Sequence, residues 1–322
     1  MKVQKYLPVL FLIALFISCQ SKKSEVPVVG FVDAFEDATV GQARIGFTEA
    51  LKKNGFSEEQ KTVKIEYHNA ESDQPTLSLI VNQFISEKVD LLATCTTLST
   101  VTAIQKTKTV PVFAMVSPTP ARMNVVSSTG ANPPNLFGVV EDLNYIDTSF
   151  NIITKLLKPK GNKLVIGMIY NQSEPQSADA VNRLKELAAN SNVSLEVLPL
   201  NNSADAQLVT KSLLSKNIDG FFALPDNSVF ASFETILKSC NQANVPIFTS
   251  EAGLVKRGAV AAFGADMYLW GFQAGEQAAQ YLKTHKTDGL KPEMVQIRKR
   301  VYNPAVAKKY NIIIPPNFEA VK

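Results

Sequence analysis

The sequence is poor in the residues that carry most enzyme chemistry. Histidine occurs only twice, as His68 and His285, and these positions have neither the spacing of zinc ligands nor a place in a Ser-His-Asp triad. The GxGxxG and P-loop motifs, the GxSxG elbow and the HExxH motif are all missing from the chain. We therefore expect a protein that is not an enzyme, with no catalytic residue, metal or cofactor. One enzymatic alternative remains, in which Glu174 and Asp226 act as acid and base.

Long runs of a single charge are also missing. The chain of 322 residues has 33 basic and 29 acidic residues and a formal charge of +4. Removing residues 1–18 takes away Lys2 and Lys5 and no acidic residue, so the remaining chain is nearly neutral. Nucleic-acid binding requires a basic patch, and we therefore expect no nucleic-acid partner.

The N-terminus has the pattern of an exported lipoprotein. Two lysines precede the apolar run 7–17, which is too short to cross a bilayer and fits a secretory signal. Ser18-Cys19 then predicts a lipoprotein processing site, with lipid on the Cys19 thiol. Residues 1–18 are predicted to be a signal peptide and residues 19–26 a lipidated tether, which would anchor the protein to a membrane outside the cytoplasm. The alternative is an ordinary signal peptide followed by an unmodified cysteine.

From residue 27 onwards, short β-branched apolar runs alternate with longer segments of helical period, such as 40–55 and 177–192. This alternation is typical of parallel βαβ units, whose sheets need helices on both faces. The expected strands are 27–33, 62–68, 89–94, 110–116 and 135–140 in a first series, and 163–170, 193–200, 218–224, 245–250, 259–263 and 293–299 in a second.

The two series predict an α/β fold with two doubly wound parallel-sheet lobes joined by a hinge. No long linker separates the series, so we expect the chain to cross between lobes near residues 140, 250 and 288. About 300 residues also fit two domains of ordinary size better than one. Residues 27–140 and 251–287 are assigned to lobe 1, and residues 141–250 and 288–322 to lobe 2.

Two cysteines remain beyond Cys19. Cys95 follows a predicted strand of lobe 1, and Cys240 lies in a predicted helix of lobe 2. A disulfide requires Cα atoms within about 7 Å, and a bridge between lobes would also clamp the hinge. Both cysteines are therefore predicted to be free thiols.

Polar residues follow several of the predicted strands, at the ends that face the cleft between the lobes. Ligands of open α/β sheets bind beyond these carboxyl ends, but the same residue types also cap helices, so both roles remain open. Thr96 and Thr97 open a helix whose free N–H groups suit a carboxylate. The other candidate ligand contacts are Asp226, Asn227, Asn171, Glu174, Ser177, Phe35, Ser117, Ser250 and Glu251. Tyr170 and Phe230 are further aromatic candidates, and Trp270 is expected in the core.

Four segments together resemble one known family. They are TVPVFAMVSPTPA, IGMIYNQSEPQSADAVNRLKELA, DGFFALPDNSVFASFETILKSCNQANVPIFTSEAGLVKRGAVAAFGADMYLWG and YNPAVAKKYNIIIPP, and their most specific pieces are the YNxxExxS and DNxV motifs. In this order the segments are similar to the ABC-transporter substrate-binding lipoproteins whose studied members bind tryptophan or tyrosine. The resemblance covers nearly the whole chain after the signal and implies a periplasmic-binding-protein-like (type I) fold.

The resemblance also implies a function. The chain would be an extracytoplasmic solute-binding lipoprotein of an ABC importer, and hinge closure would bury an amino acid or similar solute. Asp226 is the expected partner of the solute's ammonium group. The expected partners are the small-molecule solute, the membrane permease and, through Cys19, the lipid bilayer, and the protein itself is expected to be a monomer. The alternative is a solute sensor that feeds a signalling partner without transport.

Overall fold

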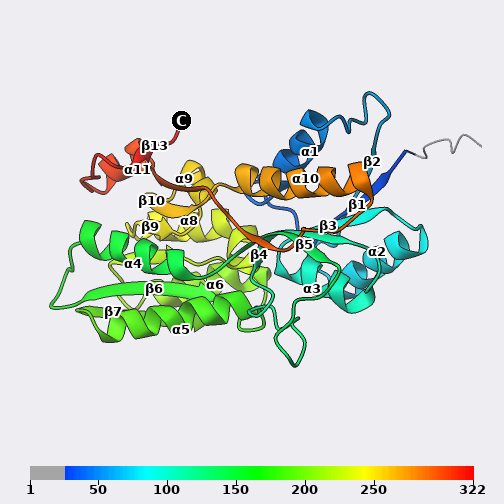
Figure 1. Cartoon of the computed structure of the whole chain (residues 1–322). Helices are drawn as coiled ribbons and strands as arrows, with labels where there is room; N and C mark the ends of the chain where they lie inside the picture. The colour runs from blue at the N-terminus through cyan, green and yellow to red at the C-terminus, as the bar shows by residue number, and fades with distance from the viewer. Residues whose placement is uncertain (1–25) are drawn as a thin grey trace, which may run out of the picture.

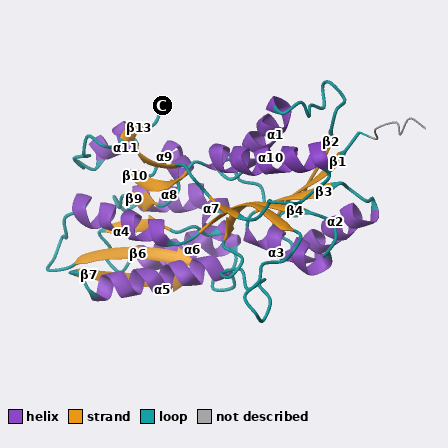
Figure 2. Ribbon diagram, viewed as in Figure 1, coloured by secondary structure: helices purple, strands orange, loops and turns teal. Residues whose placement is uncertain are grey.

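The computed structural model describes residues 26–322, which form two α/β lobes beside each other (Figure 1, Figure 2). The predicted signal peptide and Cys19 lie outside the described residues. Within residues 26–322, no helix combines the length and the apolar composition that crossing a membrane requires. The two-lobed α/β architecture predicted from the alternation of strands and helices is confirmed.

Lobe 1 is built on a six-stranded sheet in the order β11-β5-β4-β3-β1-β2, in which every pairing is parallel. Most residues of its central strands are buried, as expected for a sheet that helices cover on both faces. The strands are β1 (Val28–Asp33), β2 (Lys64–Asn69), β3 (Leu91–Cys95), β4 (Val112–Pro118), β5 (Leu136–Glu141) and β11 (Glu293–Met294). The helices are α1 (Gly41–Lys53), α2 (Gln74–Ser86), α3 (Thr97–Lys106) and α10 (Met267–Thr284).

Helices α1 and α10 lie side by side on one face of this sheet, although more than 200 residues separate them in the chain (Figure 1). Glycines make their close approach possible. A Cβ atom added at Gly271 would lie 1.8 Å from the carbonyl oxygen of Ala43, and one at Gly46 would lie 1.9 Å from that of Tyr268. The pair fixes the C-terminal part of the chain to lobe 1.

Lobe 2 is built on a seven-stranded sheet in the order β13-β12-β10-β9-β8-β6-β7. All pairings are parallel except that β12 runs antiparallel to β10. The strands are β6 (Leu164–Tyr170), β7 (Val193–Pro199), β8 (Gly220–Ala223), β9 (Ile247–Thr249), β10 (Ala261–Ala265), β12 (Arg298–Tyr302) and β13 (Glu319–Ala320). The helices are α4 (Asn144–Leu156), α5 (Pro175–Ala189), α6 (Ala206–Leu214), α7 (Asn227–Ala231), α8 (Phe233–Gln242), α9 (Ala252–Arg257) and α11 (Pro304–Lys309), with a 3₁₀ turn η1 (Ser203–Asp205).

The chain crosses between the lobes three times, after β5, after β10 and between β11 and β12. Two of the predicted boundaries need correction. Residues 251–265, assigned to lobe 1, form α9 and β10 of lobe 2, and residues 288–294, assigned to lobe 2, lead into β11 of lobe 1. The reason is that an apolar strand pattern identifies a strand but not the sheet that it joins.

The two cysteines of the described chain are both free and buried, as predicted. Cys95 ends β3 in lobe 1, and Cys240 lies in α8 of lobe 2. Burial raises the pKa of the Cys240 thiol to about 12, so this thiol stays protonated at neutral pH.

Candidate functional site

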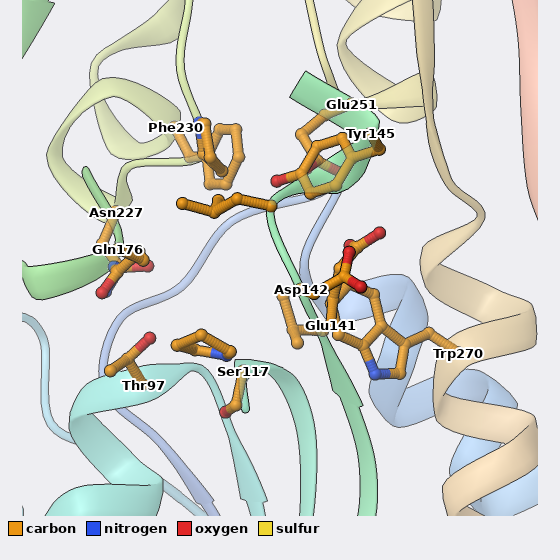
Figure 3. A pocket seen from close by; sticks show the side chains of 14 residues that line it. Thr97, Ser117, Glu141, Asp142, Tyr145, Gln176, Asn227, Phe230, Glu251 and Trp270 are labelled. Carbon is orange, nitrogen blue, oxygen red and sulfur yellow. The ribbon is translucent and has the colours of Figure 1, made fainter. Parts of the chain in front are cut away.

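A cavity of about 50 Å³ lies where the two lobes meet (Figure 3). It is bounded by the carboxyl ends of β4 and β5, by the loops after β8 and β9, and by the first turns of α3 and α5. We call it the cleft cavity. Its lining residues are Thr97, Val116, Ser117, Pro118, Glu141 and Trp270 from lobe 1, Asp142 and Leu143 from the first crossing, and Tyr145, Gln176, Pro225, Asn227, Phe230 and Glu251 from lobe 2.

Three carboxylates, Glu141, Asp142 and Glu251, line the cleft cavity, and no lysine, arginine or histidine is among its described lining residues. Glu141 is paired, since its Oε1 accepts a hydrogen bond from Arg298 Nε at 2.7 Å. Burial nevertheless raises the pKa of Glu141 to about 7, with Arg298 acting in the opposite direction. The cavity is therefore negative or neutral in every protonation state.

Glu251 is the most isolated of these carboxylates. Its residue is 2% exposed, and its Oε2 atom has no hydrogen-bond partner. Burial raises the pKa of Glu251 well above its ordinary value, and the nearby charges of Glu141 and Asp37 raise it further. Burial and the neighbouring negative charges therefore both favour the protonated form of Glu251.

On the lobe 1 side, the cavity is bordered by the hydroxyl groups of Thr97 and Ser117 and by backbone with positive φ angles. Thr97 is the first residue of α3, and the preceding Thr96 has a φ of 77° with its buried Oγ1 unpartnered. Val116 has a φ of 52°, which is unusual for a β-branched residue, next to an irregularity in the pairing of β4 with β5. Ser117 Oγ and Thr100 Oγ1 lie 3.0 Å apart and are hydrogen-bonded. Strain of this kind concentrates at ligand sites.

The lobe 2 side is held by two buried carboxylates behind the cavity wall. Glu174 Oε2 accepts hydrogen bonds from Gln176 Nε2 at 2.6 Å and from the Asn227 backbone N–H at 3.0 Å. Burial, with Asp226 beside it, raises the pKa of Glu174 to about 8. The wall itself presents Gln176 Oε1 and Asn227 Nδ2, both of which are buried and unpartnered. A bound solute could satisfy both atoms.

Asp226 does not line the cavity. Its Oδ1 accepts the Val229 N–H at 2.9 Å, which caps α7, and its Oδ2 accepts the Asn171 N–H at 2.6 Å. The residue has no exposed surface. Both carboxylate oxygens therefore accept hydrogen bonds from the backbone, which favours the helix-capping role of Asp226 over the ammonium contact, the two roles that the sequence left open.

The predicted site residues, Asp226 included, divide by the cavity that they line, and Asn227 lines both cavities. Thr97, Ser117, Asn227, Glu251 and Phe230 line the cleft cavity. Phe35, Asn171, Glu174 and Asn227 line a second cavity of about 460 Å³ between the lobes, which we call the outer cavity. Thr96, Ser177, Ser250, Asp226 and Tyr170 line neither of these two cavities.

Sequence reasoning missed several lining residues of the cleft cavity: Glu141, Asp142, Tyr145 and Gln176. Glu141 and Asp142 stand at the carboxyl end of a predicted strand, so the rule that selected Ser117 would also have found them. Trp270 was expected in the core, and it is buried with its Nε1 donating to Val139 O at 2.8 Å. Trp270 nevertheless also lines the cavity (Figure 3). Only the contact between α10 and the hinge reveals this second role.

Comparisons with known proteins agree with the geometry. A family model of ABC transporter substrate binding proteins matches residues 25–321. A tyrosine-binding protein of Clostridioides difficile (strain R20291) is 31% identical over 255 residues, which cover 79% of this chain and 72% of that protein.

Solved structures share the fold. The ABC domain in complex with L-Trp from Streptococcus pneumoniae has a TM-score of 0.82 at 24% identity, covering 92% of this chain and 99% of that one. The ligand-free, open structure of a substrate binding protein with adhesive properties from Clostridium difficile has a TM-score of 0.66 at 26% identity, with the same coverage of 92% and 99%. Because the family match spans nearly the whole described chain, this chain belongs to the family of ABC transporter substrate binding proteins.

Proposed function

We propose that this protein is the substrate-binding lipoprotein of an ABC importer and that it captures an amino acid with an aromatic side chain between its lobes. The observation that carries the proposal is the cleft cavity, which both lobes line and in which aromatic walls meet unpartnered buried polar atoms. Members of the family bind solutes and are not enzymes, in agreement with the missing catalytic motifs. The tyrosine-binding relative and the neighbour in complex with L-Trp support an aromatic solute.

Three aromatic side chains surround the space available to the solute. Phe230 lies on the lobe 2 side, Tyr145 at the start of α4, and Trp270 on α10 of lobe 1 (Figure 3). Aromatic rings prefer offset or edge-to-face partners, and such pairs add about 0.5–1.5 kcal/mol beyond the burial of their area. We infer that the solute's ring lies among these three side chains.

Hinge closure is part of the proposal. The cleft cavity of about 50 Å³ has room for a few water molecules but not for an amino acid, so the lobes must separate before a solute enters. The TM-score of 0.82 to a ligand complex, against 0.66 to an open ligand-free structure, supports a closed arrangement of the lobes here. A solute that contacts both lobes would stabilise the closed state by these differential contacts.

Anchoring and delivery are part of the proposal, and the N-terminal sequence pattern and the family support them. Substrate-binding proteins of ABC transporters are extracytoplasmic, and we propose that lipid on Cys19 holds this one at the membrane, as a monomer, beside its permease. The Cys19→Ala variant should then move from the membrane fraction to the soluble fraction, or remain uncleaved. Unchanged detergent partitioning of the variant would contradict the lipid anchor.

The solute itself can be identified directly. Small molecules released from the purified, denatured protein are analysed by mass spectrometry, and tyrosine and tryptophan are then titrated calorimetrically into protein freed of its solute. We expect an aromatic amino acid in the released fraction and tight binding of the same compound. Absence of any bound solute, together with no heat from either amino acid, would reject the proposed function. Uptake of the labelled solute that depends on this protein separates import from sensing.

A further inference from the structure

Glu251 is a buried carboxylate with no partner in the wall of the cleft cavity. It follows β9 and occupies the N-cap position of α9, but its side chain makes no capping hydrogen bond. Only 2% of the residue is exposed, and Oε2 is unpartnered. Most buried polar atoms are hydrogen-bonded, so an orphaned carboxylate that borders a cavity requires a ligand or another explanation.

The groups around Glu251 offer it no counter-charge. Glu141 and Asp142 lie at the end of β5, and Tyr145 lies on α4 (Figure 3). Asp37, in the loop before α1, adds a further negative charge. The two arginines of this region are already engaged: Arg298 pairs with Glu141, and Arg257 pairs with Asp37 and Glu234. Neither arginine lines the cavity.

We propose that Glu251 is the receptor for a protonated primary amine of the solute, and that the site selects its solutes for this amine more than for a carboxylate. The proposal rests on the proposed function and names its substrate class as aromatic primary amines, amino acids included. The amine would donate to Glu251, and its positive charge would be compensated inside a site that holds no other free cation.

A solute carboxylate has only neutral donors available. The N-terminal N–H groups of α3, the Thr97 hydroxyl and the Asn227 amide surround the opposite side of the cavity, and no lysine or arginine accompanies them among the described lining residues. These donors can bind a carboxylate, but its negative charge would enter a cavity that already contains Glu141, Asp142 and Glu251 and would find no counter-charge among the described lining residues. Loss of the carboxylate should therefore weaken binding less than loss of the amine.

Binding should release a proton. In the closed arrangement without solute, burial and then the negative charges of Glu141 and Asp37 raise the pKa of Glu251 and favour its protonated form. When R–NH₃⁺ enters, Glu251–COOH becomes Glu251–COO⁻ beside the ammonium, and the proton passes to solvent. Affinity should then rise about tenfold per pH unit, up to the pKa of Glu251 in the empty protein or that of the solute's amine.

The experiment compares three matched solutes on the wild-type protein. The aromatic amino acid that binds is titrated beside its decarboxylated amine and its deaminated acid, in two buffers of different ionisation enthalpy. We expect the amine to bind, the acid to bind at least about 30-fold more weakly than the amino acid, and about one proton to be released per amine bound. Because this series needs no mutation, a folding defect cannot obscure it.

The Glu251→Gln variant tests the residue, with Glu59→Gln as a matched change at an exposed carboxylate of lobe 1. Glu251→Gln should lose affinity for both amines at least about 30-fold and should release no proton, whereas Glu59→Gln should behave as wild type. A deaminated acid that binds as well as the amino acid would overturn the amine requirement, and so would a released solute without an amine, while solute binding itself would stand. Proton release that persists in Glu251→Gln would overturn the assignment to Glu251.

Discussion

At Glu174 and Asp226, two carboxylates are buried next to each other behind the wall of the cleft cavity. Burial raises the pKa of both groups, and for Glu174 the neighbouring Asp226 raises it further. Backbone N–H groups oppose this shift at Asp226, from Asn171 and Val229. We infer that at neutral pH Asp226 carries the charge and Glu174 carries a proton. Because the two carboxyl groups differ in protonation, substitutions at Asp226 and at Glu174 should affect stability in different ways.

The Asp226→Asn variant should reduce stability. Asn caps a helix about as well as Asp, but it has a single side-chain oxygen, so either Val229 N–H or Asn171 N–H loses its acceptor. An unsatisfied buried donor costs about 1–3 kcal/mol, and thermal unfolding should show this loss in the empty protein. The dissociation constant for the solute should change less than about threefold, since Asp226 does not line the cavity. A large loss of affinity with unchanged stability would instead make Asp226 a ligand contact.

The Glu174→Gln variant should change how stability depends on pH. Between its ordinary pKa of 4.5 and its folded pKa of about 8, Glu174 is ionised in the unfolded chain and protonated in the folded one. Unfolding therefore releases a proton, and the free energy of unfolding falls as pH rises through this window, by up to about 1.4 kcal/mol per pH unit. Gln imitates the protonated carboxyl, so the variant should match wild type near pH 4.5 and exceed it near pH 8. Chemical denaturation at several pH values checks the two slopes. Parallel slopes would mean that Glu174 is ionised in the folded protein.

At the level of elements, the sequence predicted the strands better than their partners. All five strands of the first series form in lobe 1, because short β-branched runs between helical segments leave little choice. The run 293–299 was expected as a single strand, but it divides into β11, which pairs with β5, and the start of β12, which pairs with β10. A hinge segment looks like a strand in sequence because it is extended, and only the two sheets decide where it divides.

The sequence likewise predicted only part of the candidate site, namely the residues at strand ends. Strand ends such as Ser117, Asn227 and Glu251 were found because the carboxyl-end rule depends only on local pattern. Gln176 and Trp270 lie on helices, and nothing in their local sequence distinguishes a residue that faces the other lobe from one that faces its own sheet. Contacts between lobes depend on the closing geometry, which a single sequence does not encode locally.

The packing of α1 on α10 gives a prediction at this scale. Gly271→Ala would place a Cβ 1.8 Å from the carbonyl oxygen of Ala43, so the helices must move apart. Overpacking of this kind costs about 1–3 kcal/mol. Gly41→Ala is the matched control, because no atom lies within 4 Å of the added Cβ and Ala favours the helix. Denaturant unfolding should show a loss for Gly271→Ala and none for Gly41→Ala. Equal stabilities would contradict the close contact of the two helices.

At the level of the whole molecule, ion pairs join the lobes away from the cleft cavity, and two of them differ in burial. Arg257 of α9 reaches across to Asp37, with Nη1 to Oδ2 at 2.5 Å, and both side chains are well buried, 16% and 2% exposed. Arg122 of lobe 1 pairs with Asp179 of α5 at 2.9 Å, and these side chains are 37% and 41% exposed. Ion pairs at the surface contribute about 0–1 kcal/mol, whereas removing one partner of a buried pair leaves a costly unpaired charge.

This contrast predicts that Arg257 controls closure and Arg122 does not. In Arg257→Met, Asp37 would be buried without a partner when the lobes close, whereas water would solvate it when they open. The free energy of the open state would therefore fall relative to that of the closed state. The solute's affinity should fall at least about tenfold, with the empty protein's melting temperature nearly unchanged. Arg122→Met should stay within about threefold of wild type, and its small effect should vanish at high salt. Asp37→Asn added to Arg257→Met should recover part of the lost affinity, because the unpaired charge is gone.

Calorimetric titration gives the affinities, and small-angle scattering with solute present shows whether the lobes remain open. Wild-type affinity in Arg257→Met would mean that the closed state does not depend on this pair.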